Sequence, residues 1–339
     1  MRNRVAHIIF SFTLLSQGLF SQSQMEELHL AGICDEEGYC IPSLQGLPRS
    51  KGFSLNYTTM QNQFINTEFA NESYSGSIEE SSIIEVKAKV PLLLKNNLKI
   101  ILGGEYSTYD FEFSNRDADR NPVYETLDQL RYSSLEAKLY VVKPFKGNKY
   151  IFSRISTQLT GDLSKGGIND YFRSTFSILY GIRSSINVTW GVGLNYRYAL
   201  GRHLVFPTLA YSRILSEKWS FEAYLPVSTN LRYMHNSKNI FELRNRLAGE
   251  HFNINSGTTG NESIFLRKTD FYSTLVYERE VHDFLWVSLA GGGQFNIGFD
   301  SSINNTVPGN GPFRVTNDLT NTFLLQIGIF IVPPKKWVE

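Results

Sequence analysis

The stretch INVTWGVGLNYRYALG (Ile186–Gly201) alternates between large apolar residues and small or polar ones. The large side chains occupy every second position: Ile186, Val188, Trp190, Val192, Leu194, Tyr196, Tyr198 and Leu200. Because successive side chains of a β-strand point to opposite faces, this pattern predicts a strand with one apolar and one polar face. The run also exceeds the roughly 5–6 residues that are usual for a strand in a soluble domain.

The same alternation recurs along the chain in thirteen runs, several of them as regular as the first. They are Lys51–Gln63, Ser82–Leu93, Leu98–Phe111, Arg131–Val142, Lys149–Gly161, Tyr171–Arg183, Ile186–Leu200, His203–Leu215, Lys218–Tyr233, Asn239–Glu250, Ile264–Glu280, Phe284–Asp300 and Asn321–Val332. We expect no helical segment and no second domain. The sequence therefore predicts an all-β fold.

The connections between these runs are of two lengths. Tight hairpin turns are expected at Lys95-Asn96-Asn97, Lys146-Gly147-Asn148, Ser184-Ser185 and Ser216-Glu217. Longer polar loops are expected at Asn66–Glu80, Ser114–Gln129 and Asp162–Asp170. Short turns that alternate with long loops are typical of an up-and-down meander of antiparallel strands.

The polar face of these strands carries too much charge for a protein core. In a membrane β-barrel the apolar face meets lipid and the polar face lines a lumen, and the sheet closes because hydrocarbon cannot satisfy an open edge. We therefore predict a transmembrane antiparallel barrel of about 12 strands, with 14 as the alternative. We predict interfacial aromatic residues at Trp190, Tyr198, Trp219, Tyr233 and Trp286. The predicted lumen-lining residues are Glu85, Lys87, Lys89, Glu105, Glu136, Lys138, Arg154, Arg173, Arg183, Arg197, Glu222, Arg244 and Arg246.

The N-terminus has the pattern of a secretory signal peptide, with Arg2 and Arg4 before an apolar core and a small, polar end. We predict a signal peptide at residues 1–23, a periplasmic N-terminal segment at 24–50 and an outer-membrane barrel at 51–339. In the oxidising periplasm the only two cysteines, Cys34 and Cys40, favour a disulfide. A zinc site with His29 lacks a fourth ligand, so we predict no metal.

The charge balance gives no indication of a nucleic-acid partner. The chain has 33 basic and 32 acidic residues, and no apolar run beyond the N-terminus is long enough for a transmembrane helix. The sequence has no HExxH, P-loop or GxSxG motif, so we expect no cofactor and no enzymatic activity. Outer-membrane enzymes do place Ser and His on the barrel wall, and the histidines to consider are His203, His235, His251 and His282.

Three quoted pieces carry a family resemblance: TQLTGDLSKGGINDYF (Thr157–Phe172), YGIRSSINVTWGVGLNYRYALGRHLVFPTLAYSR (Tyr180–Arg213) and LSEKWSFEAYLPVSTNLRYMHNSKNIFEL (Leu215–Leu243). From Lys149 to Ile254 the chain resembles a family of Gram-negative outer-membrane β-barrels, a domain of unknown function. The resemblance implies the fold and a location in the cell outer membrane, with its lipid as a partner. It implies no activity and no catalytic residues.

The charges on the polar face allow two functions. In the first function, the charged residues line a narrow water-filled path for small polar solutes. In the second, they pair across the bore of a filled structural or loop-mediated binding barrel without transport. Barrels of about 8 strands are filled and those of about 16–18 are open, so a barrel of intermediate size fits either function. We favour a channel or transporter, with the filled barrel as the alternative and a lipid-modifying enzyme third.

Overall fold

The computed structural model describes residues 44, 50–69, 72–114, 131–163, 168–199, 202–254, 264–303 and 314–332. The described residues all lie in one compact unit of the chain, Gly32–Glu339. The predicted signal peptide, Cys34 and Cys40 lie outside them, as does nearly all of the predicted loop Ser114–Gln129. Among the described residues, no helix is long and apolar enough to cross a membrane.

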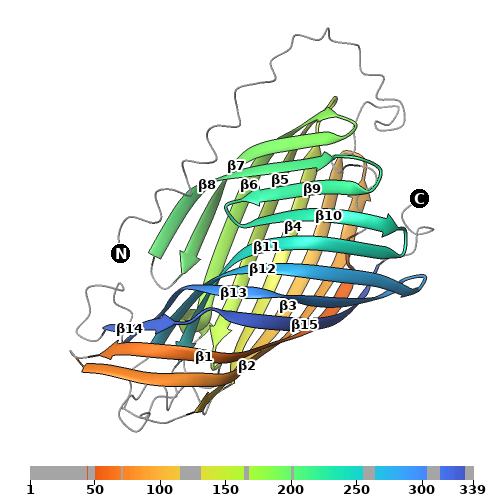
Figure 1. Cartoon of the computed structure of the whole chain (residues 1–339). Coiled ribbons are helices and arrows are strands. Elements are labelled where there is room, and N and C mark those ends of the chain that lie inside the picture. Colours follow the sequence, from red (N-terminus) through yellow and green to blue (C-terminus); the bar gives the residue numbers. More distant parts are fainter. Residues whose placement is uncertain are drawn as a thin grey trace, which may run out of the picture. The chain divides into compact units, whose positions relative to one another are not determined.

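Antiparallel strands make up almost all of the described chain (Figure 1). They are β1 (Phe53–Phe69), β2 (Glu72–Lys95), β3 (Leu98–Ser114), β4 (Tyr132–Pro144), β5 (Lys149–Gly161), β6 (Phe172–Ser185), β7 (Val188–Ala199), β8 (Arg202–Ile214), β9 (Trp219–Leu225), β10 (Ser228–Asn236), β11 (Asn239–Ile254), β12 (Ile264–His282), β13 (Leu285–Ile303), β14 (Arg314–Leu319) and β15 (Thr322–Ile331). A single helical turn, α3 (Ile168–Tyr171), precedes β6, so the expectation of no helix is wrong at this point.

Each strand from β1 to β13 pairs with the next along the chain, and the sheet closes on itself. The closing pair joins β1 to β15, with Phe53 opposite Ile331 and Met60 opposite Leu324. Figure 1 shows β15 beside β1 at this seam. A closed sheet leaves no strand edge unpaired, which is the condition for a barrel in a membrane. The predicted all-β closed antiparallel barrel is confirmed.

The wall of the described barrel has fourteen strands, the alternative to the preferred count of 12. β14 and β15 both pair with β1 and with β13, so they are two parts of one wall strand. The predicted run Lys218–Tyr233 is a hairpin, in which β9 and β10 are joined by a turn where the Val227 N–H donates to the Tyr224 carbonyl at 2.7 Å. Pro226 therefore lies in a turn, where its missing N–H leaves no strand hydrogen bond unmade. Because this one predicted run contains two strands, the number of strands in the wall is even.

Two predicted connections differ from the structure. The predicted loop Asn66–Glu80 belongs to a long hairpin, because β1 and β2 stay paired from Phe53–Ala88 to Phe69–Glu72. The predicted turn at Ser184-Ser185 lies two residues later, at positions 186–187, so the strand of the opening stretch begins at Val188. Polar residues in both places have the composition of a loop, but pairing in the sheet satisfies their backbone groups as well as water does.

The strand faces follow the alternation seen in the sequence. On β7 the side chains of Val192 and Leu194 are 50% and 54% exposed on the outside, whereas Asn195 is only 3% exposed. The apolar outward row on β15 repeats this pattern, with Phe323, Leu325 and Ile327 all exposed. Outside, the barrel is apolar; inside, it holds most of the buried polar groups.

The first apolar cluster fills the barrel at the end where β3 ends and β4 begins. Tyr109 on β3 meets Phe252 on β11 edge to face, with ring centroids 5.0 Å apart, and Phe111 meets Phe299 on β13 at 6.3 Å. Since β3 neighbours neither β11 nor β13 in the sheet, these rings touch across the interior. We call this group the aromatic plug; it also contains Ile65, Ile78, Phe113, Tyr132, Ile254, Leu266 and Leu319.

The second apolar cluster lies inside the opposite end, near the short turns. Trp286 stacks on Phe330 with ring centroids 5.8 Å apart, and Ile240 and Val332 pack with them. Trp286 is only 5% exposed, so its prediction as an interfacial aromatic residue is wrong. Its even position on β13, shared with the inward Ala290 and Gln294, places it inside.

Candidate functional site

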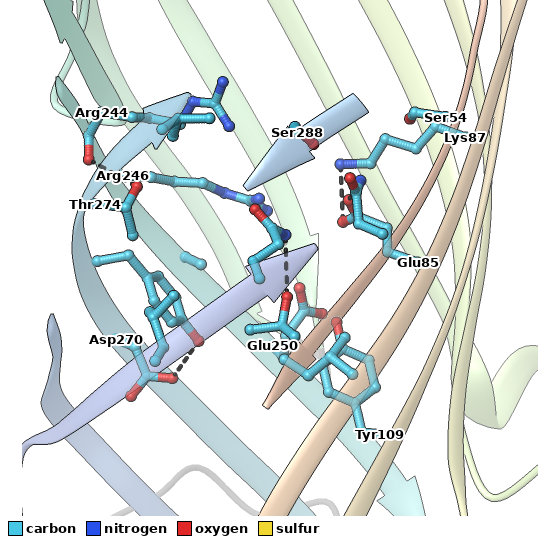
Figure 2. A pocket seen from close by; sticks show the side chains of 18 of the residues that line it. Ser54, Glu85, Lys87, Tyr109, Arg244, Arg246, Glu250, Asp270, Thr274 and Ser288 are labelled. Atoms are coloured by element: carbon cyan, nitrogen blue, oxygen red, sulfur yellow. Dashed lines mark hydrogen bonds and ion pairs between the residues drawn. The ribbon is translucent and has the colours of Figure 1, made fainter. Parts of the chain in front are cut away.

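A polar pocket of about 310 Å³ lies inside the barrel, and Tyr109 of the aromatic plug forms part of its lining. Figure 2 shows side chains from β1, β2, β11, β12 and β13 turned toward it. Its charged lining residues are the basic Lys51, Lys87, Arg244, Arg246 and Lys268 and the acidic Glu85, Glu250, Asp270 and Glu278. The pocket is therefore charged but nearly balanced.

An ion-pair network joins β2, β3 and β4 on one side of the interior. Lys87 Nζ lies 2.8 Å from Glu85 and 3.5 Å from Glu105. Lys138 Nζ lies 2.5 Å from the other oxygen of Glu105 and 2.9 Å from Glu136. These five predicted residues are thus brought together. The sixth charged residue here, Lys89, has its ammonium group 5.5 Å from the centre of the Tyr140 ring.

A second network joins β9 to β12 through Glu242, which is almost fully buried. Arg232 lies 2.8 Å from Glu222 and 3.5 Å from Glu242. Arg244 lies 3.1 Å from Glu242 and 3.7 Å from Glu278, which also accepts from Lys51 at 2.6 Å. The predicted Glu222 and Arg244 belong to this network.

Two predicted arginines cross the interior to the backbone of β11. Arg173 on β6 donates to the carbonyl of His251 at 3.2 Å, and Arg197 on β7 donates to the carbonyl of Gly249 at 3.1 Å. Beside them β5 itself touches β11, where the Asp162 N–H donates to the Asn253 carbonyl at 3.2 Å. These contacts hold β5, β6 and β7 against β11 at the end that the aromatic plug occupies.

The other predicted residues have individual partners. Arg183 lies at the short-turn end and donates to the carbonyls of Ser185 and Ile186 at 3.3 and 3.0 Å. Arg154 lies 3.4 Å from the Ser177 hydroxyl. Arg246 reaches into the pocket. That the predicted residues line a path for solutes remains a prediction.

Several charged residues of the interior were missed by the sequence analysis. Asp270 and Glu278 share their face of β12 with Thr274, so the alternation rule alone could have found them. Glu250 follows Arg246 on the same face of β11 in the same way. Lys51 precedes β1, and nothing in the sequence pattern indicates that its ammonium group reaches Glu278.

Three of the histidines considered for catalysis contact aromatic rings, and the fourth contacts an arginine. His203 Nδ1 lies 2.7 Å from the Tyr196 hydroxyl and its ring stacks on that tyrosine. His235 packs near Tyr233, and His282 meets Phe284 edge to face. His251 Nδ1 lies 3.2 Å from Arg197. None of these contacts brings a serine to a histidine.

The family described as "Domain of unknown function (DUF6268)" matches residues 52–302. The chain belongs to this family. The match to DUF6268 confirms the resemblance seen in residues 149–254 and covers nearly the whole barrel. Among curated proteins, none matches the chain in sequence.

Solved structures with some likeness to this DUF6268 barrel are other β-barrels. One is a mutant of TodX, the toluene transporter of Pseudomonas putida, which is described as a monoaromatic hydrocarbon channel. It has 8% identity and a TM-score of 0.41, and the match covers 84% of this chain and 91% of that chain. A Pseudomonas aeruginosa FadL homologue has 7% identity, a TM-score of 0.38 and coverage of 84% and 90%. The Escherichia coli outer membrane protease OmpT has 9% identity, a TM-score of 0.28 and coverage of 86% and 100%.

Proposed function

We propose that the protein is an outer-membrane β-barrel that admits small polar solutes to its interior pocket and acts as a narrow, gated channel. Two observations support the location. The described barrel has an apolar outer face on a closed sheet, and the N-terminus has the pattern of an export signal.

The observation that carries the proposed activity is the polar pocket between the two apolar clusters. A cavity of about 310 Å³ lined by nine charged residues is unusual in an interior that serves stability alone, because each buried charge costs several kcal/mol unless it is paired or hydrated. Its Arg246 is exposed to solvent although it lies within the barrel. The pocket therefore offers at least one accessible charged group to a solute.

The aromatic plug is the barrier that a passing solute must move. Its rings contact one another across the interior, so a path past them requires that a few side chains move. We expect brief openings in the wild type, and more frequent or larger ones when a ring is removed.

A planar-bilayer measurement with the purified full chain tests this proposal. The wild type is expected to conduct in short events, and Phe252→Ala to conduct more, because Phe252 is fully buried in the aromatic plug. The matched control is Phe323→Ala, which removes an equal ring from the outer face, where it is 62% exposed. Silence of both the wild type and Phe252→Ala in folded protein would contradict the channel.

The ion-pair networks favour a second function, the filled structural or loop-mediated binding barrel. In the described interior, most charged side chains already have partners of opposite charge within 4 Å, as expected for groups that hold a wall together. A silent, thermally stable wild type would support this function. An outer-membrane enzyme has no comparable observation in its favour.

A further inference from the structure

Arg246 and Glu250 differ from the other charged residues of the pocket. Within the described chain, every other charged lining residue lies within 4 Å of a partner, through the Lys51–Glu278, Lys87–Glu85, Arg244–Glu278 and Lys268–Asp270 pairs. Arg246 and Glu250 take part in none of these pairs. One cation and one anion of the pocket are therefore available to a ligand.

Both side chains project into the same space from β11. They stand four residues apart on the inward face, and the residue between them on that face, Ala248, is small and also lines the pocket. Four residues of a strand span roughly 13 Å, and the two charged groups are close enough to interact electrostatically. Figure 2 shows Arg246 and Glu250 among the side chains that reach into the pocket.

The field around Arg246 disfavours a ligand with a net charge. Its guanidinium interacts electrostatically with Glu85, Glu105 and Glu250, which repel an anion that approaches Arg246. A cation that approaches Glu250 meets Arg197 and Arg246, which repel it, and the more weakly acting Glu105 and Glu136, which attract it. A solute that carries both charges has an attractive partner for each. Opposite charges on one small molecule thus suit this pair better than either charge alone.

We propose that the pocket binds small zwitterionic solutes with one carboxylate and one ammonium group, of which an α-amino acid is the simplest. The inference rests on the proposed function, since it names the class of solute that the pocket admits. The carboxylate is held by the two parallel N–H groups of the Arg246 guanidinium, and the ammonium group donates to Glu250. A volume of about 310 Å³ is at the small end of ligand pockets, which suits a molecule of this size.

Calorimetric titration of the full chain in detergent tests the binding with three matched probes. L-Alanine carries both charges, propionate lacks its ammonium group and ethylammonium lacks its carboxylate. We expect L-alanine to bind about tenfold to hundredfold more tightly than either analogue, because a hydrogen bond to a charged group contributes about 1.5–3 kcal/mol. Equal binding of the three probes, or none, would overturn the inference.

Two variants assign each charge to its residue. Arg246→Gln should remove the preference for L-alanine over ethylammonium, and Glu250→Gln the preference over propionate. The control is Arg131→Gln, which breaks an exposed ion pair with Asp110 outside the pocket and should bind like the wild type. Thermal melting of each variant confirms that it is folded. Preferences that survive in both pocket variants would place the binding elsewhere and refute the assignment.

Failure of this inference can be told apart from failure of the channel. Titration in detergent requires no passage through the barrel, whereas conductance requires no preference among solutes. A wild type that conducts but treats the three probes alike keeps the channel and loses the zwitterion site. A wild type that prefers L-alanine but never conducts keeps the site and loses the channel.

Discussion

Gly161 is the residue at which two distant parts of the barrel wall meet. It ends β5 with a φ of 155°, a conformation that side chains rarely adopt. A Cβ built there would lie 2.0 Å from the Asn253 carbonyl oxygen and 2.7 Å from the Tyr171 ring. Only a glycine lets β5 touch β11 at this point, and neighbouring Asp162 then donates to the same carbonyl.

Gly161→Ala should therefore weaken this contact. We expect the free energy of unfolding to fall by about 1–3 kcal/mol, the cost of holding a side chain in a disfavoured backbone region. The matched control is Gly104→Ala, whose added methyl group meets no atom within 4 Å. Denaturant unfolding in detergent measures both. An equal, small effect of the two substitutions would mean that the backbone at Gly161 adapts without strain.

At the scale of the strand, β7 shows how the surroundings act on alternate side chains. Leu194 lies near the middle of the strand on the outer face, and Ile186 lies in the turn before it; both are at least half exposed. In water, a charged side chain would cost about the same at these two positions. In a bilayer they differ in depth, and depth determines the cost of a charge.

Leu194→Arg should destabilise the barrel in lipid by about 2–4 kcal/mol, and Ile186→Arg by only about 0–1 kcal/mol, because the turn lies near the interface. Unfolding in urea from lipid vesicles provides the comparison. If both variants were as stable as the wild type, the outer face of β7 would not contact hydrocarbon. The two substitutions change exposed side chains of similar size, so packing within the barrel is not disturbed in either.

The element boundaries show what the sequence could predict. Alternation located nearly every strand, because a period of two is the direct result of strand geometry. It failed at Lys218–Tyr233, where the period continues across the turn at Pro226, so a hairpin has the pattern of one long strand. At Trp286 the alternation predicts an inward side chain and the general preference of tryptophan for interfaces predicts an outward one, and the structure follows the alternation.

The candidate site was predicted only in part, for a different reason. Alternation shows which residues face inward, and Glu85, Lys87, Arg244 and Arg246 were found in this way. It cannot show which inward residues meet, because β2 and β11 approach one another only across the closed barrel. The cross-lumen bonds of Arg173 and Arg197 to β11 therefore had no counterpart in the sequence.

At the scale of the whole molecule, the interior is polar in its pocket and apolar in the two clusters. The ion pairs of the pocket consequently differ from surface pairs in their exposure to water. Lys268 and Asp270, 2.6 Å apart, are each no more than 4% exposed, whereas Arg131 and Asp110 form a pair that is open to solvent. This difference makes the hydration of the interior measurable.

Asp270→Asn removes the anionic partner of buried Lys268, and Asp110→Asn does the same for exposed Arg131. Breaking a buried pair costs about 3–5 kcal/mol, since it leaves an uncompensated charge, whereas an exposed pair contributes only about 0–1 kcal/mol. The double change Lys268→Met with Asp270→Leu should recover much of that loss, because an apolar pair of similar volume needs no hydration. Urea unfolding in lipid compares the three. If Asp270→Asn cost no more than Asp110→Asn, water would reach Lys268 freely, and this part of the pocket lining would be hydrated like the protein surface.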